Sequence, residues 1–70
     1  MIKRSNKWYE ARLSLYFERT FGAYEETAEW HINPAPNKWK FNIPELEFTV
    51  TLTCDNRGRV TETREKLPPL

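Results

Sequence analysis

The sequence predicts a small, mostly β domain in which four or five antiparallel strands curl into a barrel or sandwich. Apolar and polar residues alternate without a break from Glu45 to Cys54, which is the pattern of a half-buried strand. The turn-forming run Asp55-Asn56-Arg57-Gly58 follows directly, and shorter alternating stretches lie upstream. The alternative is an α+β fold in which an N-terminal helix packs across a four-stranded sheet.

The chain has 70 residues, which is too short for two hydrophobic cores and predicts one domain, residues 1–70. We expect residues 1–6 and 67–70 to be loosely ordered, as chain ends commonly are. No apolar run approaches the roughly 20 residues that cross a bilayer, so we expect no membrane partner. A single cysteine allows no internal disulfide, which favours a reducing, cytoplasmic setting.

The strand from Glu45 to Cys54 pairs, in this interpretation, with a returning strand from Arg59 to Lys66. Gly58 can adopt the left-handed conformation that closes a short hairpin. A three-residue loop then places Thr51 opposite Thr63. Phe48, in the middle of the apolar face, is expected at the centre of the core.

The returning strand carries charge on its inner face. The predicted register turns Glu62, Arg64 and Lys66 toward the apolar side of the hairpin. Inward-pointing charge protects an edge strand from pairing with other chains, so we expect this strand at an edge of the sheet.

Two upstream segments also alternate. Tyr24 to Ile32 is expected to form another half-buried strand, which the prolines of the Asn33–Asn37 loop bring to an end. Trp39 to Cys54 is interpreted as one bent strand, or two strands around a kink, because the apolar positions change from odd to even at Pro44. A β-bulge, which adds one residue, would account for the change.

The segment from Tyr9 to Phe21 fits two structures. A strand is favoured, because nearly all of its apolar residues occupy odd positions, and it would turn at Phe21-Gly22-Ala23 into a hairpin with Tyr24 to Ile32. A helix is the alternative, because a helical stripe passes through Tyr9, Leu13, Tyr16 and Phe17, and good helix formers are frequent.

The residue types that carry catalysis are scarce, and we predict no enzyme activity, no cofactor and no metal site. His31 falls on the polar positions of its expected strand, and Cys54 falls on the apolar positions beside a turn. Such placements predict a solvated histidine and a buried, structural thiol. The acidic run at Glu25, Glu26 and Glu29 lacks the spacing of a calcium loop and reads as a solvated edge.

One candidate binding surface combines aromatic and basic residues. Lysines bracket an aromatic ring in Lys38-Trp39-Lys40, just after the proline loop, and an expected outer strand face adds further rings and a cation. Aromatic rings that stack bases, beside cations that follow phosphates, are typical of single-stranded nucleic-acid binding. Outward aromatic residues are also typical of protein contacts. The candidate residues are Lys38, Trp39, Lys40, Trp8, Arg12 and Tyr16.

The balance of charge bears on that choice. The formal net charge is +1, so the whole molecule has no built-in long-range attraction to nucleic acid. We therefore predict a non-enzymatic protein-interaction module, with a single-stranded nucleic-acid-binding domain as the alternative.

Three runs and one glycine carry a resemblance to other proteins: Glu18-Arg19-Thr20-Phe21, Ala28-Glu29-Trp30-His31-Ile32-Asn33-Pro34, Leu52-Thr53-Cys54-Asp55 and Gly58. In these the chain resembles small uncharacterised proteins encoded on mobile elements of Gram-positive bacteria. The resemblance covers most of the chain and implies the setting of a mobile-element accessory protein. It implies no activity and no site residues.

Overall fold

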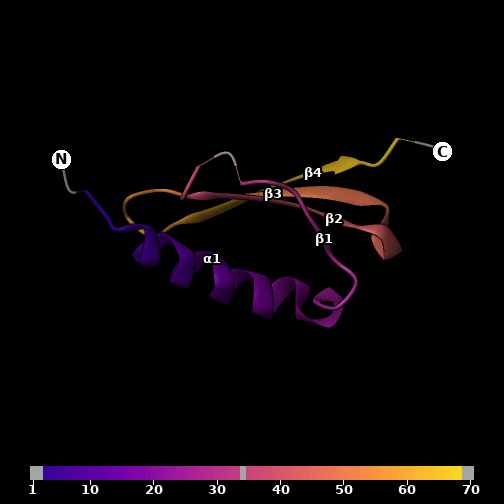
Figure 1. The fold of residues 1–70 in the computed structure, drawn as a ribbon, viewed down its shortest axis with the longest axis horizontal. Coiled ribbons are helices and arrows are strands. Elements are labelled where there is room, and N and C mark those ends of the chain that lie inside the picture. Colours follow the sequence, from indigo (N-terminus) through magenta and orange to yellow (C-terminus); the bar gives the residue numbers. More distant parts are fainter. Residues whose placement is uncertain (1–2, 34, 69–70) are drawn as a thin grey trace.

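The computed structural model describes residues 3–33 and 35–68 and has two layers (Figure 1). One layer is a single long helix, α1 (Asn6–Phe21), and the other is a four-stranded antiparallel sheet with strand order β1-β2-β3-β4. The sheet is open, so the α+β alternative is right and the barrel or sandwich is wrong. The strands are β1 (Glu29–Trp30), β2 (Lys38–Ile43), β3 (Phe48–Cys54) and β4 (Val60–Lys66).

The helix forms where a strand had been favoured. Its N-terminus is capped by Ser5, whose Oγ accepts a hydrogen bond of 3.1 Å from the backbone N–H of Trp8. Leu13, Phe17 and Phe21 are buried at intervals of four residues. A spacing of four satisfies a helical stripe and also the two-residue period of a strand, which is why the odd positions misled the prediction.

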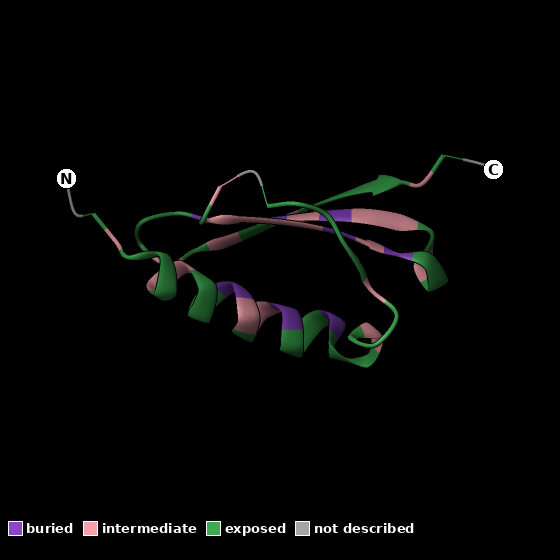
Figure 2. Ribbon diagram, viewed as in Figure 1, coloured by how far each residue is buried: buried purple, intermediate pink, exposed green. Residues whose placement is uncertain are grey.

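Leu15 is the residue that separates the two interpretations. It shares the odd positions of the buried residues, yet 48% of its surface is exposed. A residue two positions from a buried one faces the opposite side of a helix, whereas on a strand it would face the same side. Figure 2 shows the resulting pattern, with buried segments of α1 toward the sheet and exposed segments away from it.

The core lies between α1 and the inner face of β2 and β3. Phe41 is at its centre, fully buried, with its ring centroid 5.1 Å from that of Phe17 and 5.5 Å from that of Phe21. Phe48 is only partly buried and packs at the margin, so the expectation that it is central is wrong. The buried residues are Leu13, Phe17, Phe21, Phe41, Ile43, Val50, Leu52 and Cys54.

The change of apolar positions at Pro44 marks a hairpin. Ile43 of β2 pairs with Phe48 of β3, and a 3₁₀ turn (Pro44–Leu46) followed by Glu47, at φ 61°, joins the two strands. An even number of connecting residues places odd positions of one strand opposite even positions of the next. The predicted single bent strand, and the extension of the second strand back to Glu45, are therefore wrong. The alternative of two strands is right in number, but a hairpin and not a kink joins them.

The second hairpin confirms its prediction. Thr51 pairs with Thr63 and Cys54 with Val60, and the backbone N–H of Asp55 donates to the carbonyl of Arg59 at 2.9 Å. Gly58 closes the turn at φ +90°. β4 is an edge strand, as expected.

The predicted strand from Tyr24 to Ile32 is largely wrong. The chain leaves α1 through a 3₁₀ turn (Gly22–Tyr24) and reaches the sheet only at β1. There Glu29 pairs with Asn42 and Trp30 with Phe41. Because the preceding segment is the helix α1, the predicted strand has no hairpin partner before it. Only Glu29 and Trp30 pair, and their partner is the edge of β2.

The ends of the described chain are attached to the fold. Arg4 Nε donates to the carbonyl of Asn56 at 3.1 Å, and the N–H of Leu67 donates to the carbonyl of Glu47 at 2.8 Å. Residues 1, 2, 69 and 70 of the predicted loose ends lie outside the described residues. Within residues 3–33 and 35–68, no helix is long and apolar enough to span a membrane.

Candidate binding surfaces

The strand β2 divides the predicted Lys38-Trp39-Lys40 surface between two faces of the sheet. Successive side chains of a strand point to opposite faces, so Lys38 and Lys40 lie on the open face and Trp39 lies on the face that carries α1. Trp39 is partly buried and packs against the core. The lysines therefore do not bracket the indole on one surface.

The remaining predicted site residues form a separate group on α1. Trp8, Arg12 and Tyr16 follow one another at intervals of four and share one side of the helix. The Tyr16 hydroxyl donates a 2.6 Å hydrogen bond to Glu62 Oε1 of β4, so this side of α1 faces the β4 edge. The structure keeps Trp8, Arg12 and Tyr16 together.

The other side of α1 forms a groove that contains Trp39. Two hollows, of about 570 Å³ and about 190 Å³, share this residue. Four of their helix residues, Asn6, Glu10, Ser14 and Glu18, lie two positions from Trp8, Arg12 or Tyr16, about 200° around the helix. The structure therefore separates Trp39 from that group. We name the two hollows together the tryptophan groove, lined by Asn6, Glu10, Ser14, Phe17, Glu18, Glu25, Trp30, Asn33, Ala35, Pro36 and Trp39.

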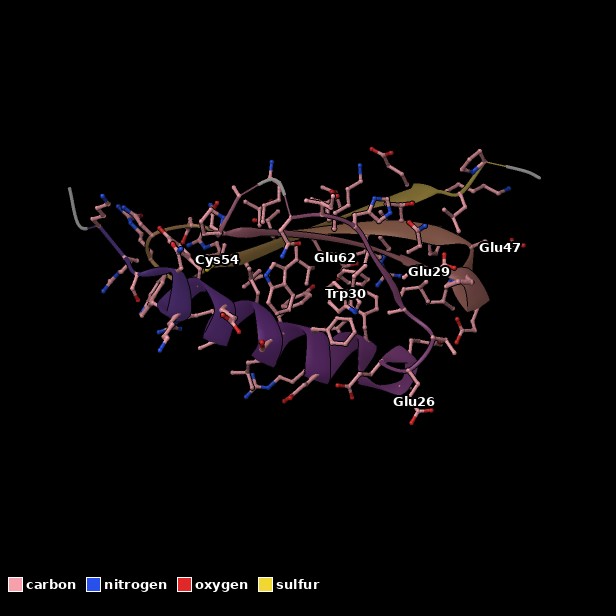
Figure 3. All side chains as sticks on the ribbon, in the orientation of Figure 1. Glu26, Glu29, Trp30, Glu47, Cys54 and Glu62 are labelled. Atoms are coloured by element: carbon pink, nitrogen blue, oxygen red, sulfur yellow. The ribbon has the colours of Figure 1, made fainter. Side chains whose placement is uncertain are left out.

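Aromatic rings form the inner wall of the tryptophan groove. Trp30 and Trp39 meet edge to face, with ring centroids 5.4 Å apart and an interplanar angle of 87°. Trp30 also lies 5.1 Å from Phe17 and 4.8 Å from Phe41, between centroids, which fixes it against the core (Figure 3). Even so, 48% of the surface of Trp30 is exposed, so this ring is open to solvent beside the smaller hollow.

The rim of the tryptophan groove is acidic. Glu10, Glu18 and Glu25 contribute carboxylates to it, and neither hollow has a Lys or Arg among its lining residues. In the part of the chain that the structure describes, Arg64–Glu62 is the one ion pair, so these three carboxylates have no cationic neighbour within salt-bridge distance.

The sequence prediction missed this groove. Trp30 had been placed within a longer strand, and Glu10 and Glu18 were not recognised as part of one helical face because a strand was favoured there. A sequence signal does exist: Asn6, Glu10, Ser14 and Glu18 recur at intervals of four, which places them on one helical stripe.

His31 and Cys54, the residues considered for catalysis, lie in different environments. Exposed His31 lies on the open face of the sheet, with its Nε2 atom 2.8 Å from Asn42 Oδ1. Cys54 is buried, as predicted, and burial raises the pKa of its thiol. Among residues 3–33 and 35–68, no group of three His, Cys, Asp or Glu side chains could hold a metal ion.

The charge of the partly buried Glu62 on β4 is compensated. The Glu62 carboxylate accepts hydrogen bonds from Tyr16 and Arg64. Burial disfavours its charged form, but these two hydrogen bonds outweigh burial and hold the pKa of Glu62 below its usual value. The same hydrogen bond to Glu62, with burial, raises the pKa of Tyr16. The hydrogen bond between Tyr16 and Glu62 thus connects the edge strand β4 to α1.

Comparison with protein-family models, with curated proteins and with solved structures found no match to this chain.

Proposed function

We propose that this protein is a non-enzymatic protein-interaction module that binds a basic, extended segment of a partner protein in the tryptophan groove. One observation carries the proposal: a half-exposed tryptophan lines the same hollow as carboxylates that have no ion-pair partner among residues 3–33 and 35–68. Trp30 supplies the apolar contact, and Glu10, Glu18 and Glu25 supply the charge.

The chemistry of the tryptophan groove suits a lysine or arginine side chain. The face of an indole ring attracts a cation, with about 0.5–2 kcal/mol depending on how far the contact excludes water. Carboxylates at the rim add an attraction that acts over a Debye length of about 8 Å at physiological salt. The same carboxylates repel phosphates, which disfavours the nucleic-acid alternative at Trp39.

The shape of the tryptophan groove suits a short segment. Its helix wall runs from Asn6 to Glu18, which spans about 18 Å at the rise of an α-helix. An extended chain advances about 3.3 Å per residue, so about five residues fill that length. A groove that is open along its length leaves the ends of the segment free to continue into a folded partner.

The setting in which the module works is part of the same proposal. A lone, buried thiol at Cys54 needs no oxidising compartment, which supports a cytoplasmic location. A role as an accessory protein of a Gram-positive mobile element rests on the sequence resemblance. Neither His31 nor Cys54 supports a catalytic role, because His31 bonds an amide on the open face and Cys54 is buried.

Isothermal titration calorimetry with short blocked peptides tests the proposal. We expect a lysine- and arginine-rich heptapeptide to bind, and a glutamate-rich peptide of equal length not to bind. Trp30→Ala removes the half-exposed ring and, at about 1–2 kcal/mol for a partly desolvated cation–π contact, should raise Kd about 5- to 30-fold. Glu18→Gln should weaken binding without touching the core.

Leu15→Ala is the matched control for Trp30→Ala. Leu15 is equally exposed, at 48%, but lies on the side of α1 that faces away from the sheet. The Leu15→Ala variant should leave the Kd of the basic peptide unchanged. Equal binding of the basic and acidic peptides, or the same loss in Leu15→Ala as in Trp30→Ala, would contradict the proposal.

A further inference from the structure

Basic side chains from two distant segments meet at the end of the molecule where α1 begins. One segment is the N-terminal arm with the first turns of α1, and the other is the β3–β4 turn. Figure 3 shows nitrogen-tipped side chains gathered at this end, around and beyond the labelled Cys54. We name this end the basic pole, formed by Lys3, Arg4, Lys7, Arg12, Arg57 and Arg59.

Specific contacts hold the two segments of the basic pole together. Arg4 Nε donates to the carbonyl of Asn56 in the turn, at 3.1 Å. The guanidinium carbons of Arg4 and Arg12 lie 4.4 Å and 4.8 Å from the centre of the Trp8 ring. The guanidinium of Arg12 also lies against Gly58, where an added Cβ would approach it to 3.0 Å. Arg4 and Arg12 are thus placed by the fold.

The positive charge of the basic pole is only partly offset by the nearby Asp55 carboxylate. The first turn of α1 contains no acidic residue, although the positive end of the helix dipole favours one there. Asp55, in the turn, directs its carboxylate at the backbone N–H groups of Arg57 and Arg59, each at 2.9 Å. The hydrogen bond from the Arg59 backbone, opposed in part by desolvation, lowers the pKa of Asp55.

None of the cations of the basic pole is in an ion pair with a carboxylate of residues 3–33 or 35–68. Glu10 is close in sequence, but it lines the tryptophan groove, on the side of α1 opposite Arg12. The basic pole is therefore a concentrated patch of positive charge.

The formal net charge of +1 conceals this patch. The molecule is 44 Å long, and the labelled Glu26, Glu29 and Glu47 lie toward the end opposite the basic pole (Figure 3). Salt screens exposed charges beyond a Debye length of about 8 Å. A ligand at the basic pole therefore experiences the local cations, while the distant glutamates contribute little.

We propose that the basic pole binds the backbone phosphates of nucleic acid. Arginine predominates in it, and a guanidinium offers the planar, bidentate donors that match a phosphate. An anionic membrane fits less well, because the exposed large apolar residues of the described chain are Leu15, Trp30 and Ile32, none of them in the basic pole. This site is separate from the tryptophan groove and does not depend on the proposed function.

The test is fluorescence anisotropy of labelled DNA 20-mers, one single-stranded and one duplex, with the complete chain at 50 mM and 200 mM salt. The double variant Arg57→Gln/Arg59→Gln removes two side-chain cations. The hydrogen bonds to Asp55 in the turn come from the backbone N–H groups of these residues, so the substitutions leave them in place. The control is Lys38→Gln/Lys40→Gln, which removes equal charge from the open face of the sheet. Circular dichroism verifies that both double variants are folded.

We expect saturable binding at 50 mM salt that weakens steeply at 200 mM. The Arg57/Arg59 variant should reduce the slope of log K against log salt by about 1.4–1.8, since each lost phosphate contact contributes about 0.7–0.9. The lysine control should retain the parental slope. Comparison of the two probes assigns the contact to single strands, to duplex or to both, each of which supports the proposal.

Three results would overturn the proposal. The first is no binding of either DNA at 50 mM salt, and the second is an equal loss of slope in the two double variants. The third is equally tight binding of vesicles of phosphatidylcholine and phosphatidylserine (3:1) or of a glutamate-rich peptide. Either of those ligands would show a general attraction for anions.

Discussion

Phe41→Ala should remove a large part of the stability of this domain. Phe41 is fully buried, and its ring centroid lies 5.1 Å from that of Phe17, 5.5 Å from Phe21 and 4.8 Å from Trp30. Truncation of such a residue costs about 3–5 kcal/mol, from lost burial and the cavity left behind. A chain of 70 residues has about 4–10 kcal/mol of stability in total, so the variant should be marginal.

Phe48→Ala provides the comparison, because sequence alone places Phe48 at the centre. Phe48 is only partly buried at the margin of the core, so its truncation should cost about 1–2 kcal/mol. Urea denaturation followed by far-UV circular dichroism measures both free energies of unfolding. If Phe41→Ala is too unstable to analyse, Phe41→Leu should still lose more stability than Phe48→Ala. Equal losses in the two alanine variants, or a Phe41→Ala melting temperature within a few degrees of the parent, would refute this account of the core.

Three further predictions concern the β3–β4 hairpin. Because the pKa of Glu62 is held below its unfolded-state value of about 4.3, its stabilisation is complete above that pH and is lost as the pH falls through the lower folded-state pKa. Glu62→Gln should flatten this acid loss in urea melts, and an unchanged acid limb would contradict the stabilising contacts of the Glu62 carboxylate with Arg64 and Tyr16. Gly58→Ala should lose about 1–2 kcal/mol of stability, because φ is +90° there; a neutral effect would argue against the turn. The Cys54 thiol should react with a thiol reagent at neutral pH only as fast as the protein unfolds, and immediate labelling would show that it is accessible.

The sequence alone was sufficient to predict an element whose polar face meets water and whose turn residues agree with that pattern. The hairpin of β3 and β4 was predicted with its register, because the alternation ending at Cys54 and the turn at Gly58 agree with each other. It was insufficient where two periods coincide. Leu13, Phe17 and Phe21 fit a strand as well as a helix, and only the partner surface, here the sheet, decides between the two.

The joint between β2 and β3 shows a second limit. A change of apolar positions at Pro44 fits both a bulge within one strand and a hairpin with an even number of connecting residues. Glu47 adopts a left-handed conformation, which is rare for a residue with a side chain. A glycine or asparagine would have indicated a turn at this position, but a glutamate does not. The alternation of apolar and polar residues alone does not indicate whether the chain continues or reverses at such a point.

The candidate binding surfaces show a third limit. Trp39 and its lysines are neighbours in sequence, yet the strand directs them to opposite faces. Arg4 and Asn56 are far apart in sequence, yet the fold joins them in the basic pole. Binding surfaces assembled from separate elements become visible only after the elements are placed.

The tryptophans offer the most direct measurement of the central claim, that a basic segment binds in the tryptophan groove. Trp30 and Trp39 line that groove, whereas Trp8 lies on the other side of α1 between arginines, and each indole N–H gives its own signal in a ¹H–¹⁵N correlation spectrum. Titration with the lysine- and arginine-rich peptide should shift the Trp30 and Trp39 signals and leave the Trp8 signal in place. A shift of the Trp8 signal alone, or no shift of any indole at saturating peptide, would contradict the claim.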